Sequence, residues 1–341
     1  MTGTAYARAG LLGNPSDGYG GKAIAVSLSD FRVQVDLEAG ESVSARGSFS
    51  HDRVQRTLLA LKDDFPIRDS DDGTALLEAA LRRFLKAFPE IAQRGPEDPG
   101  FRFSMRFQTD IPRQVGLAGS SAIVIAGLRA LSQWFSAELP VHAMAELALA
   151  AETQELGIAA GPMDRIIQAQ EGLVAMDLSQ PGDCSTYRVM DTACLPAFFL
   201  VWDPRGGQPS GQAHGDFKRR WERGDPEVLA AIGAFRDLVD EGLALLERRD
   251  FAGFRDAMDQ NFALRQKVFQ VGERDQEMVA LARRYGAGAK LCGSGGAVIG
   301  SPRSESDFEI LKRKYLEMGY GFIRPQVRVP GHEMRREGEE A

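Results

Sequence analysis

The sequence predicts an α+β protein with two domains, and three observations support this. A chain of 341 residues is several times longer than one hydrophobic core requires. A hydrophobic share of 43% and a charged share of 26% are those of an average soluble globular protein, which excludes disordered, collagen-like and disulfide-stapled chains. Segments with strand and helix periodicity alternate, but without the regular rhythm of a Rossmann fold or a β/α barrel.

Charge and composition also exclude several partners. The 41 basic and 48 acidic residues leave a net charge of −7, which argues against nucleic acid or an anionic membrane as the main partner. No run approaches eighteen apolar residues, so we expect no transmembrane helix. The start, MTGTAYARAG, lacks the pattern of a secretory signal, and three cysteines cannot form a closed disulfide set. We therefore expect a cytoplasmic protein.

The first half of the chain mixes strands and helices. Lys22–Phe31 and Arg32–Leu37 alternate with period two, which predicts strands of a mostly antiparallel sheet. Apolar residues recur at helical spacing in Ala75–Phe88 and predict an amphipathic helix. Phe101–Phe107 alternates again as a strand. A glycine-rich turn then opens a nearly continuous apolar segment, which predicts a buried helix that ends at Phe135.

The second half is richer in helices. Val141–Leu156 follows a proline and ends at a glycine, which is typical of a complete helix. Asp225 and Pro226 form a good N-cap and first turn for the next long helix. The remaining predicted elements are strands at Leu173–Leu178, Ala197–Trp202 and Gly321–Val329, and helices at Asp250–Val271, Asp275–Tyr285 and Asp307–Met318. A boundary near Gln180–Leu195 divides the chain into domains 1–185 and 186–330, followed by a polar tail, 331–341.

Glycine is over-represented: 37 of the 341 residues are glycine, about 11%, whereas the usual share is about 7%. Glycines gather in three segments, Arg8–Lys22, Pro112–Ala122 and Gly286–Gly300. Glycine lets backbone amides approach an anion, and a glycine turn that opens a helix adds the positive end of the helix dipole. The second segment has this form. Of its two hydroxyls, Ser120 and Ser121, one can cap the helix and the other can ligate Mg²⁺ or contact a phosphate.

A purely structural role for these segments is about as well supported by the residues as a role in binding an anion. Glycine turns are common, and the two serines can be a simple helix N-cap. Neither the G-x-x-x-x-G-K-[ST] loop nor a dinucleotide-binding G-x-G-x-x-G follows a strand here. The residues alone therefore predict only an anionic, phosphate-bearing ligand.

Taken together, the three segments resemble the motifs of the GHMP kinases, the family of galactokinase, homoserine kinase and mevalonate kinase. The resemblance extends from Arg8 to about Val329. The segments GLLGNPSDGYGGK, AAETQELGIAAGPMDR and DPRGGQPSGQAHGDFKRRW are most similar to the glucuronokinase branch. The resemblance implies a ribosomal-protein-S5-like N-terminal domain and a ferredoxin-like C-terminal domain, with ATP and sugar bound between them.

The resemblance also implies how ATP and Mg²⁺ bind. The second segment would wrap the ATP phosphates through Pro112, Gly116, Leu117, Ala118, Gly119, Ser120, Ser121 and Ala122. Ser121 and Glu152 would ligate Mg²⁺. This chain has one residue more than the usual family spelling before its serine pair, so Ser120 stays open as the metal ligand, and Glu155 is the reserve for Glu152.

The catalytic carboxylate of the family lies in a G-x-x-D turn, which is Gly161–Asp164 here. Asp164 would orient or deprotonate the attacking hydroxyl, as phosphoryl transfer requires. From the sequence alone Asp164 is more readily a helix N-cap, and only the resemblance favours the catalytic interpretation. Arg8 matches the basic residue of galactokinases and mevalonate kinases. A cation there would favour the ionised Asp164 or substrate hydroxyl and stabilise the transferring phosphoryl group.

The sugar contacts implied by the resemblance centre on Asp17, with Asn14 and Tyr19 beside it. A uronic acid adds a carboxylate, which a guanidinium recognises best. The arginines in question are Arg113, Arg165 and Arg205, without a ranking, and a lid or sugar contact is expected at Ser210 and His214. The third motif would support the other two loops through Lys290, Gly293, Ser294, Gly295 and Gly296. Cys292, without a histidine neighbour in the sequence, is not expected to be a nucleophile.

The expected function is an ATP- and Mg²⁺-dependent sugar 1-kinase that converts D-glucuronate to its 1-phosphate. Two alternatives stay open. One is another GHMP sugar kinase, for galactose, arabinose or a heptose phosphate, and the other is a catalytically silent sugar sensor. The expected partner is a small sugar or uronic acid, and both a monomer and a homodimer are compatible with the sequence.

Overall fold

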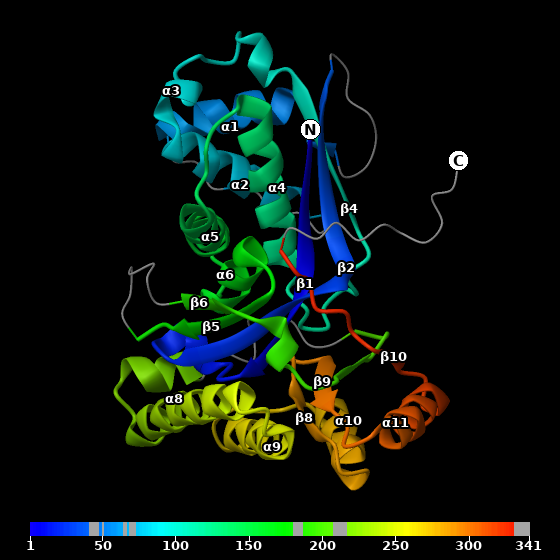
Figure 1. Cartoon of the computed structure of the whole chain (residues 1–341). Coiled ribbons are helices and arrows are strands. Elements are labelled where there is room, and N and C mark those ends of the chain that lie inside the picture. Colours follow the sequence, from blue (N-terminus) through cyan, green and yellow to red (C-terminus); the bar gives the residue numbers. More distant parts are fainter. Residues whose placement is uncertain are drawn as a thin grey trace, which may run out of the picture.

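The computed structural model describes residues 1–40, 48–49, 51–63, 67, 73–179, 187–206 and 217–330. Helices pack against a six-stranded and a four-stranded sheet (Figure 1). All strand pairs of both sheets within these residues are antiparallel. The α+β prediction is therefore confirmed.

The larger sheet has the order β3-β4-β2-β5-β6, with β1 paired to β2. Its strands are β1 (Thr2–Leu12), β2 (Lys22–Ala39), β3 (Ser48–Phe49), β4 (Phe103–Thr109), β5 (Leu173–Asp177) and β6 (Tyr187–Met190). The two strands predicted between Lys22 and Leu37 are one continuous strand, β2. Sequence reasoning missed β1, because its second half is buried on both faces and shows no polar alternation.

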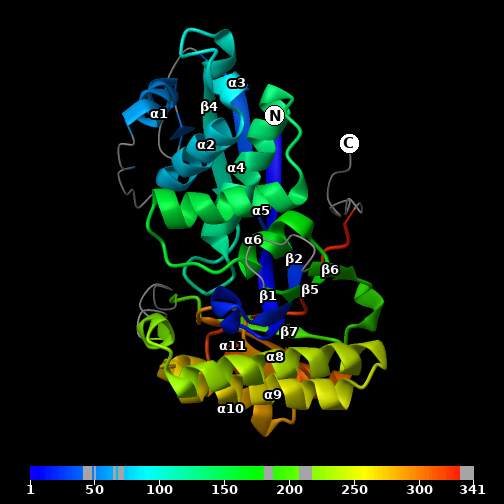
Figure 2. The ribbon, with the colours of Figure 1, turned by 90° about the vertical axis from the view of Figure 1, so that its left-hand side faces the viewer.

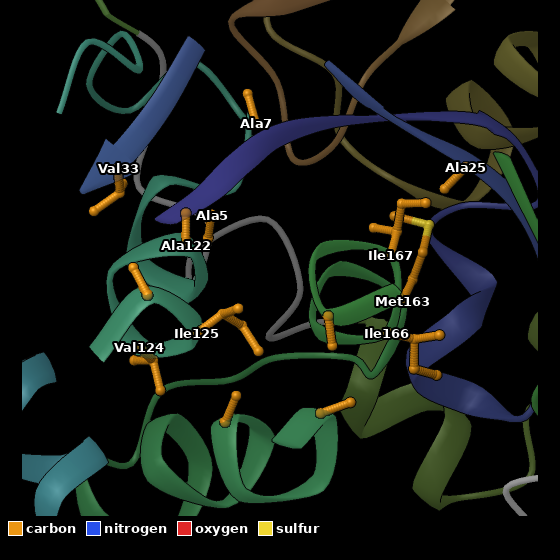
Figure 3. Packing of buried hydrophobic residues seen from close by; sticks show 14 of the residues in the cluster. Ala5, Ala7, Ala25, Val33, Ala122, Val124, Ile125, Met163, Ile166 and Ile167 are labelled. Atoms are coloured by element: carbon orange, nitrogen blue, oxygen red, sulfur yellow. The ribbon is translucent and has the colours of Figure 1, made fainter. Parts of the chain in front are cut away.

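Helices cover one face of this sheet (Figure 2). They are α1 (His51–Asp63), α2 (Thr74–Ala87), α3 (Pro89–Ala92), α4 (Gly119–Phe135), α5 (Val141–Ala150) and α6 (Met163–Gln170). Figure 3 shows Ala5 of β1 beside Ala122 and Ile125 of α4 in the main core. A Cβ at Gly3 would overlap the carbonyl of Ala126, so α4 lies directly on β1. Small residues on β1 thus bring the start of α4 close to Arg8, whose N–H bonds the Leu117 carbonyl at 3.3 Å.

The smaller sheet has the order β10-β7-β9-β8. Its strands are β7 (Phe199–Trp202), β8 (Gly288–Leu291), β9 (Ala297–Ser301) and β10 (Gly321–Ile323), and its helices are α8 (Pro226–Glu247), α9 (Phe251–Val268), α10 (Glu273–Arg284) and α11 (Glu305–Glu317). Asp225 caps α8 as predicted, because its carboxylate accepts the Glu227 N–H at 2.9 Å. Figure 1 shows these elements at the opposite end of β1 and β2 from α1 to α4.

The C-terminal segment connects the two sheets. A strand was predicted at Gly321–Val329, but β10 ends at Ile323. The chain then returns to β2, where the Ser29 N–H bonds the Gln326 carbonyl at 2.9 Å and the Arg328 N–H bonds the Ser27 carbonyl at 2.9 Å. This segment pairs with the larger sheet instead of extending the smaller one, which explains the shorter strand.

The remaining expectations concern the domain boundary, the C-terminal tail and membrane-spanning helices. The domain division at 185/186 stays a prediction, as does the polar tail 331–341, which lies outside the described residues. Across the described ranges, the helices are all too short or too polar to cross a membrane.

Candidate active site

One cavity of about 920 Å³ brings the three glycine segments together. Its lining includes the turn after β1, the loop before α4, the turn before α6 and the loop between β8 and β9. The segments far apart in the sequence therefore meet at one place, as expected of a ligand site. One end of the cavity is polar and the other is apolar.

Arg8 and Asp164 form a bidentate ion pair at the polar end. Arg8 Nε donates to Asp164 Oδ1 at 2.6 Å, and Nη2 donates to Oδ2 at 2.8 Å. Arg8 is 4% exposed, whereas the Asp164 side chain is 19% exposed and lines the cavity. The α6 helix has Pro162 as its N-cap, so Asp164 is not the capping residue. An ionised carboxylate has about four acceptor positions on its two oxygens, so it can accept a hydroxyl as well as a guanidinium.

Two carbonyls of the loop before α4 accept hydrogen bonds from side chains of other elements. Arg8 Nη1 donates to the Gly116 carbonyl at 2.6 Å, and Gln168 Nε2 donates to the Ala118 carbonyl at 2.9 Å. Ala118 and Gly116 adopt left-handed conformations with φ of 63° and 70°. In a trans peptide the N–H of the next residue points opposite to the carbonyl. Because these two carbonyls are hydrogen-bonded to Arg8 and Gln168, the N–H groups that follow them point the other way, where they can donate to an anion.

The helix start differs from one detail of the prediction. A serine cap was expected, but the N-cap of α4 is Ala118 and its side chain makes no capping bond. The Ser121 hydroxyl is 1% exposed and donates back to the Ala118 carbonyl at 3.2 Å. The first amides of α4 are therefore without a side-chain cap, which suits an anion at this helix terminus.

Glu152 lies at the other side of this helix start. It belongs to a π-helical turn (Ala151–Glu155) that continues α5, a deviation common at functional sites. Its side chain is fully buried yet lines the cavity. Glu152 Oε1 accepts the Ser120 hydroxyl at 2.9 Å, and Oε2 accepts Arg165 Nε at 2.7 Å. Arg165 and Glu152 therefore form a buried ion pair.

Glu155, the reserve metal ligand, has a structural role. Its carboxylate pairs with Arg82 at 3.1 Å, Arg83 at 2.8 Å and Lys86 at 3.1 Å, all on α2. These pairs hold the π-helical turn against α2 and leave Glu152 as the carboxylate that faces the cavity.

The oxygens of Ser120 and Glu152 fit an Mg²⁺ ion bound with ATP. A hydroxyl and a carboxylate are oxygen ligands of the kind that Mg²⁺ takes. The Ser120 hydroxyl donates to Glu152 Oε1 at 2.9 Å, and both side chains line the cavity. Within the described part of the chain no group of three or more His, Cys, Asp or Glu residues could hold a metal. One carboxylate and one hydroxyl suffice for Mg²⁺, which takes its other ligands from phosphates and water.

The predicted sugar contacts Asn14, Asp17 and Tyr19 also line the polar end. The Tyr19 ring makes edge contacts with Phe217 at 4.7 Å and Trp221 at 5.5 Å between ring centroids. Trp221 is 37% exposed and lines the cavity, as does Lys218. Sequence reasoning missed these two residues as part of the cavity lining, because only the fold places them beside the first motif.

Asp17 has a perturbed titration. Burial, followed by the negative charge of Asp164, raises the pKa of Asp17 from 3.8 to about 6. A raised carboxyl pKa means that the folded state holds the proton more tightly, so stability falls as the pH rises from about 4 to 6 and stays lower above.

We therefore expect Asp17→Asn to unfold at a higher temperature than the wild type at pH 7.5. The gain should be about 1–2 kcal/mol, reduced by the partial exposure of the carboxyl. Thermal unfolding at pH 7.5 and pH 4.5 checks this, and the gain should shrink at the lower pH. An equal difference at both pH values would contradict the assigned titration.

Two other predicted residues, Arg205 and Lys290, do not line the cavity. Arg205 is paired with Asp203, with Nε–Oδ1 at 2.7 Å and Nη2–Oδ2 at 2.9 Å, outside the lining formed by the described residues. Lys290 is 1% exposed and donates to Asn14 Oδ1 at 2.5 Å and the Gly10 carbonyl at 2.7 Å. Burial lowers its pKa well below the ordinary value. Ser210 and His214 lie outside the described residues.

The third loop packs on the other two, as the resemblance implied. A Cβ at Gly293 would lie 2.7 Å from Arg8 Nη2, and a Cβ at Gly116 would lie 2.6 Å from the Gly295 carbonyl oxygen. Backbone thus contacts backbone or the guanidinium at both places, which only glycine permits. Cys292 is fully buried, and burial raises its pKa to about 12, so it is no nucleophile.

The apolar end of the cavity contains side chains that fit a flat ring. They are Leu76, Phe107, Ile111 and Ile123, with Gly73 between them. They come from α2, β4 and α4 and from the loop before α4, residues 110–118, which is called the phosphate loop below.

Comparisons with known proteins identify the family of the chain. "GHMP kinases N terminal domain" matches residues 75–172, and "GHMP kinases C terminal" matches residues 243–321. The chain is 33% identical over 326 residues to Glucuronokinase 1 of Arabidopsis thaliana, covering 92% of this chain and 89% of that protein. It is 30% identical over 146 residues to the D-glycero-alpha-D-manno-heptose 7-phosphate kinase of Campylobacter jejuni, covering 40% of this chain and 42% of that protein.

The fold itself matches a solved structure of the same family. The mevalonate kinase of Methanococcus jannaschii superposes with a TM-score of 0.73 at 17% identity, covering 96% of this chain and 98% of that chain. The two-domain GHMP kinase fold implied by the motifs is thereby confirmed. Family matches in both halves and a 33% identical relative along nearly the whole chain lead to one conclusion: the protein belongs to the GHMP kinase family.

Proposed function

We propose that this protein transfers the terminal phosphoryl group of ATP to the anomeric hydroxyl of D-glucuronate. The observation that carries the proposal is the Asp164 carboxylate, held at the polar end by Arg8 and adjacent to the phosphate loop. The glucuronokinase relative supports the choice of sugar. The apolar end of the cavity suits adenine, which leaves the polar end for the sugar.

Asp164 orients the anomeric hydroxyl for in-line attack. As the sugar oxygen bonds to the terminal phosphorus, the bond from phosphorus to the bridging oxygen of ADP breaks, and the hydroxyl proton passes to Asp164. Arg8 stabilises the negative charge of the transferring group and keeps the carboxylate in place. The amides at the start of α4 hold the phosphates.

Ser120 and Glu152 are the residues that would hold Mg²⁺, because both line the cavity and their oxygens are adjacent. When bound, the ion neutralises phosphate charge and fixes the phosphate chain. Ser121, the metal ligand expected from the motif, is 1% exposed and is not part of the cavity lining, whereas Ser120 is, which supports Ser120.

We expect Ser120→Ala to raise the Mg²⁺ concentration for half-maximal activity about 10-fold or more, as loss of a metal-site partner does. Ser121→Ala is the matched control, because its hydroxyl faces the loop carbonyl, and its Mg²⁺ requirement should stay near the wild-type value. Mg²⁺ titration of ADP release checks both variants. The reverse order of effects would assign the metal to Ser121.

A carboxylate on the substrate would be recognised at the cavity rim. Of the three arginines considered, Arg113 is exposed, lines the cavity and has no ion pair with a carboxylate in the described part of the chain. Arg165 and Arg205 are bound to Glu152 and Asp203. Lys218 lies on the same lining and offers a second cation.

A panel of sugars in an ADP-release assay tests the proposal. Glucuronate should give the highest kcat/KM among glucuronate, galacturonate, glucose, galactose, arabinose and a heptose 7-phosphate. The last sugar is included because of the heptose phosphate kinase relative. Turnover of a neutral sugar or the heptose phosphate without glucuronate would overturn the substrate. Sugar binding without any ADP release would favour a silent sensor.

A further inference from the structure

Arg265 of α9 is a buried cation that the mechanism above does not use. It is 3% exposed, and within the described ranges no carboxylate lies at ion-pair distance from it. Burial lowers its pKa to about 10, so it keeps its charge at neutral pH. The charge of Asp275, and then those of Asp17 and Arg8, also act on that pKa, so the Arg265 guanidinium lies near Asp275 and near the polar end of the cavity. An unpaired buried cation is costly unless it serves an anion or a fixed backbone geometry.

The hydrogen bonds of Arg265 go to the third glycine loop. Nη1 donates to the Gly293 carbonyl at 2.7 Å and Nη2 to the Ser294 carbonyl at 2.9 Å. Arg8 Nη1 lies 3.4 Å from the preceding carbonyl, that of Cys292. Two guanidinium groups therefore hold three successive carbonyls of this loop.

The held carbonyls determine where the amides point. The peptides of this loop are trans, and in a trans peptide the N–H points opposite to the carbonyl. The N–H groups of Ser294 and Gly295 therefore point away from Arg265. A Cβ placed on Gly116 would lie 3.2 Å from the Ser294 nitrogen and 3.0 Å from the Gly295 nitrogen, so both amides face the phosphate loop.

Ser294 also offers its side chain. It is partly exposed and lines the cavity. Neither its hydroxyl nor its N–H has a hydrogen-bond partner among the residues that the structure describes. Two free donors on one residue, next to Gly116 and Arg8, indicate a place for an anion.

We propose that Ser294 binds the terminal phosphoryl group of ATP through its N–H and hydroxyl, and that Arg265 is the positioning residue that aims it. The inference rests on the proposed function only in taking MgATP as the phosphoryl donor. It extends the phosphate site to the loop between β8 and β9, opposite the start of α4. The third motif then contributes directly to transition-state binding in addition to supporting its neighbours.

The test uses three variants and one control of the full chain. Arg265→Met removes the charge and both donors, Arg265→Lys keeps the charge but cannot hold two carbonyls, and Ser294→Ala removes the hydroxyl and keeps the amide. Arg283→Met is the control. The Arg283 guanidinium packs over the Phe262 ring, with Cζ 5.1 Å from the ring centroid. It donates to the Asp259 carboxylate and is not part of the cavity lining.

Two readouts separate positioning from stability. The first is kcat at a temperature where each variant is folded, with the sugar that the wild type turns over fastest. The second is the ratio of the affinities for a non-hydrolysable ATP analogue and for ADP, both with Mg²⁺ and without sugar. A role in folding alone would change neither readout in the folded protein.

Arg265→Met should lower kcat about 100-fold, the usual effect of losing a preorganised donor to developing charge. It should also lower the analogue-to-ADP affinity ratio about 10-fold. Ser294→Ala and Arg265→Lys should lower both readouts less, about 5-fold to 10-fold. Arg283→Met should lower the unfolding temperature and leave kcat and the ratio unchanged.

Wild-type kcat and an unchanged ratio in folded Arg265→Met would overturn the proposal. If Arg265→Met does not fold, Ser294→Ala decides, and an unchanged ratio there would overturn the phosphoryl contact. If no sugar is turned over, the proposed function fails, while the nucleotide titrations still decide this inference because they need no sugar.

Discussion

Replacing Asp164 by asparagine is expected to lower kcat by about 10²–10⁴-fold, the range for losing a positioned proton acceptor. The asparagine is nearly isosteric, and its oxygen can still accept from Arg8, which now donates to both carboxylate oxygens at 2.6 and 2.8 Å. What the variant loses is the negative charge and the site for the hydroxyl proton. ADP release at saturating sugar and MgATP measures the change.

The matching measurements show that the loss is chemical. KM for MgATP should change less than about 3-fold, because the phosphate loop is held by Gln168 and by the backbone, independently of Asp164. The circular dichroism spectrum should match that of the wild type. Asp164→Asn with near-normal kcat would refute the catalytic role.

Replacing Arg8 by methionine is expected to produce the largest combined effect. It removes the bidentate guanidinium partner from the mostly buried Asp164 and the donor from the Gly116 carbonyl. Breaking such a pair from one side costs about 3–5 kcal/mol of stability. Loss of the cation beside the transferring phosphoryl group should lower kcat by at least about 10²-fold. Denaturant unfolding and ADP release measure the two effects.

Arg8→Lys separates charge from geometry. Lysine keeps the charge but cannot make the two parallel bonds to Asp164 and also reach the Gly116 carbonyl. We expect stability between those of wild type and Arg8→Met and kcat lowered about 10-fold to 100-fold. An Arg8→Met variant with wild-type kcat in its folded state would show that the ion pair serves stability alone.

The elements with clear periodicity were predictable from the sequence, and those without it were not. The helix at α2 and the strands at β4, β5 and β7 show alternation or helical spacing and were predicted within a few residues. The second half of strand β1 is buried on both faces, so it carries no period-two signal. The return of residues 324–330 to β2 depends on long-range pairing that local sequence does not encode.

The same distinction holds for the candidate site. Arg8, Ser120, Glu152 and Asp164 stand in recognisable motifs, and the structure brings all four to one cavity. Gln168 and Arg265 each donate hydrogen bonds to backbone carbonyls of a glycine loop and so fix the conformation of that loop. A helix residue that bonds to a distant carbonyl leaves no local signal, so such positioning residues appear only in the fold.

The most direct test of the account is the product formed from MgATP and D-glucuronate by the wild-type protein, determined by NMR. The account predicts one phosphate per ADP released, with the anomeric proton coupled to phosphorus, as the proposed transfer to the anomeric hydroxyl requires. No phosphorylated glucuronate, or phosphate on any other hydroxyl, would contradict it.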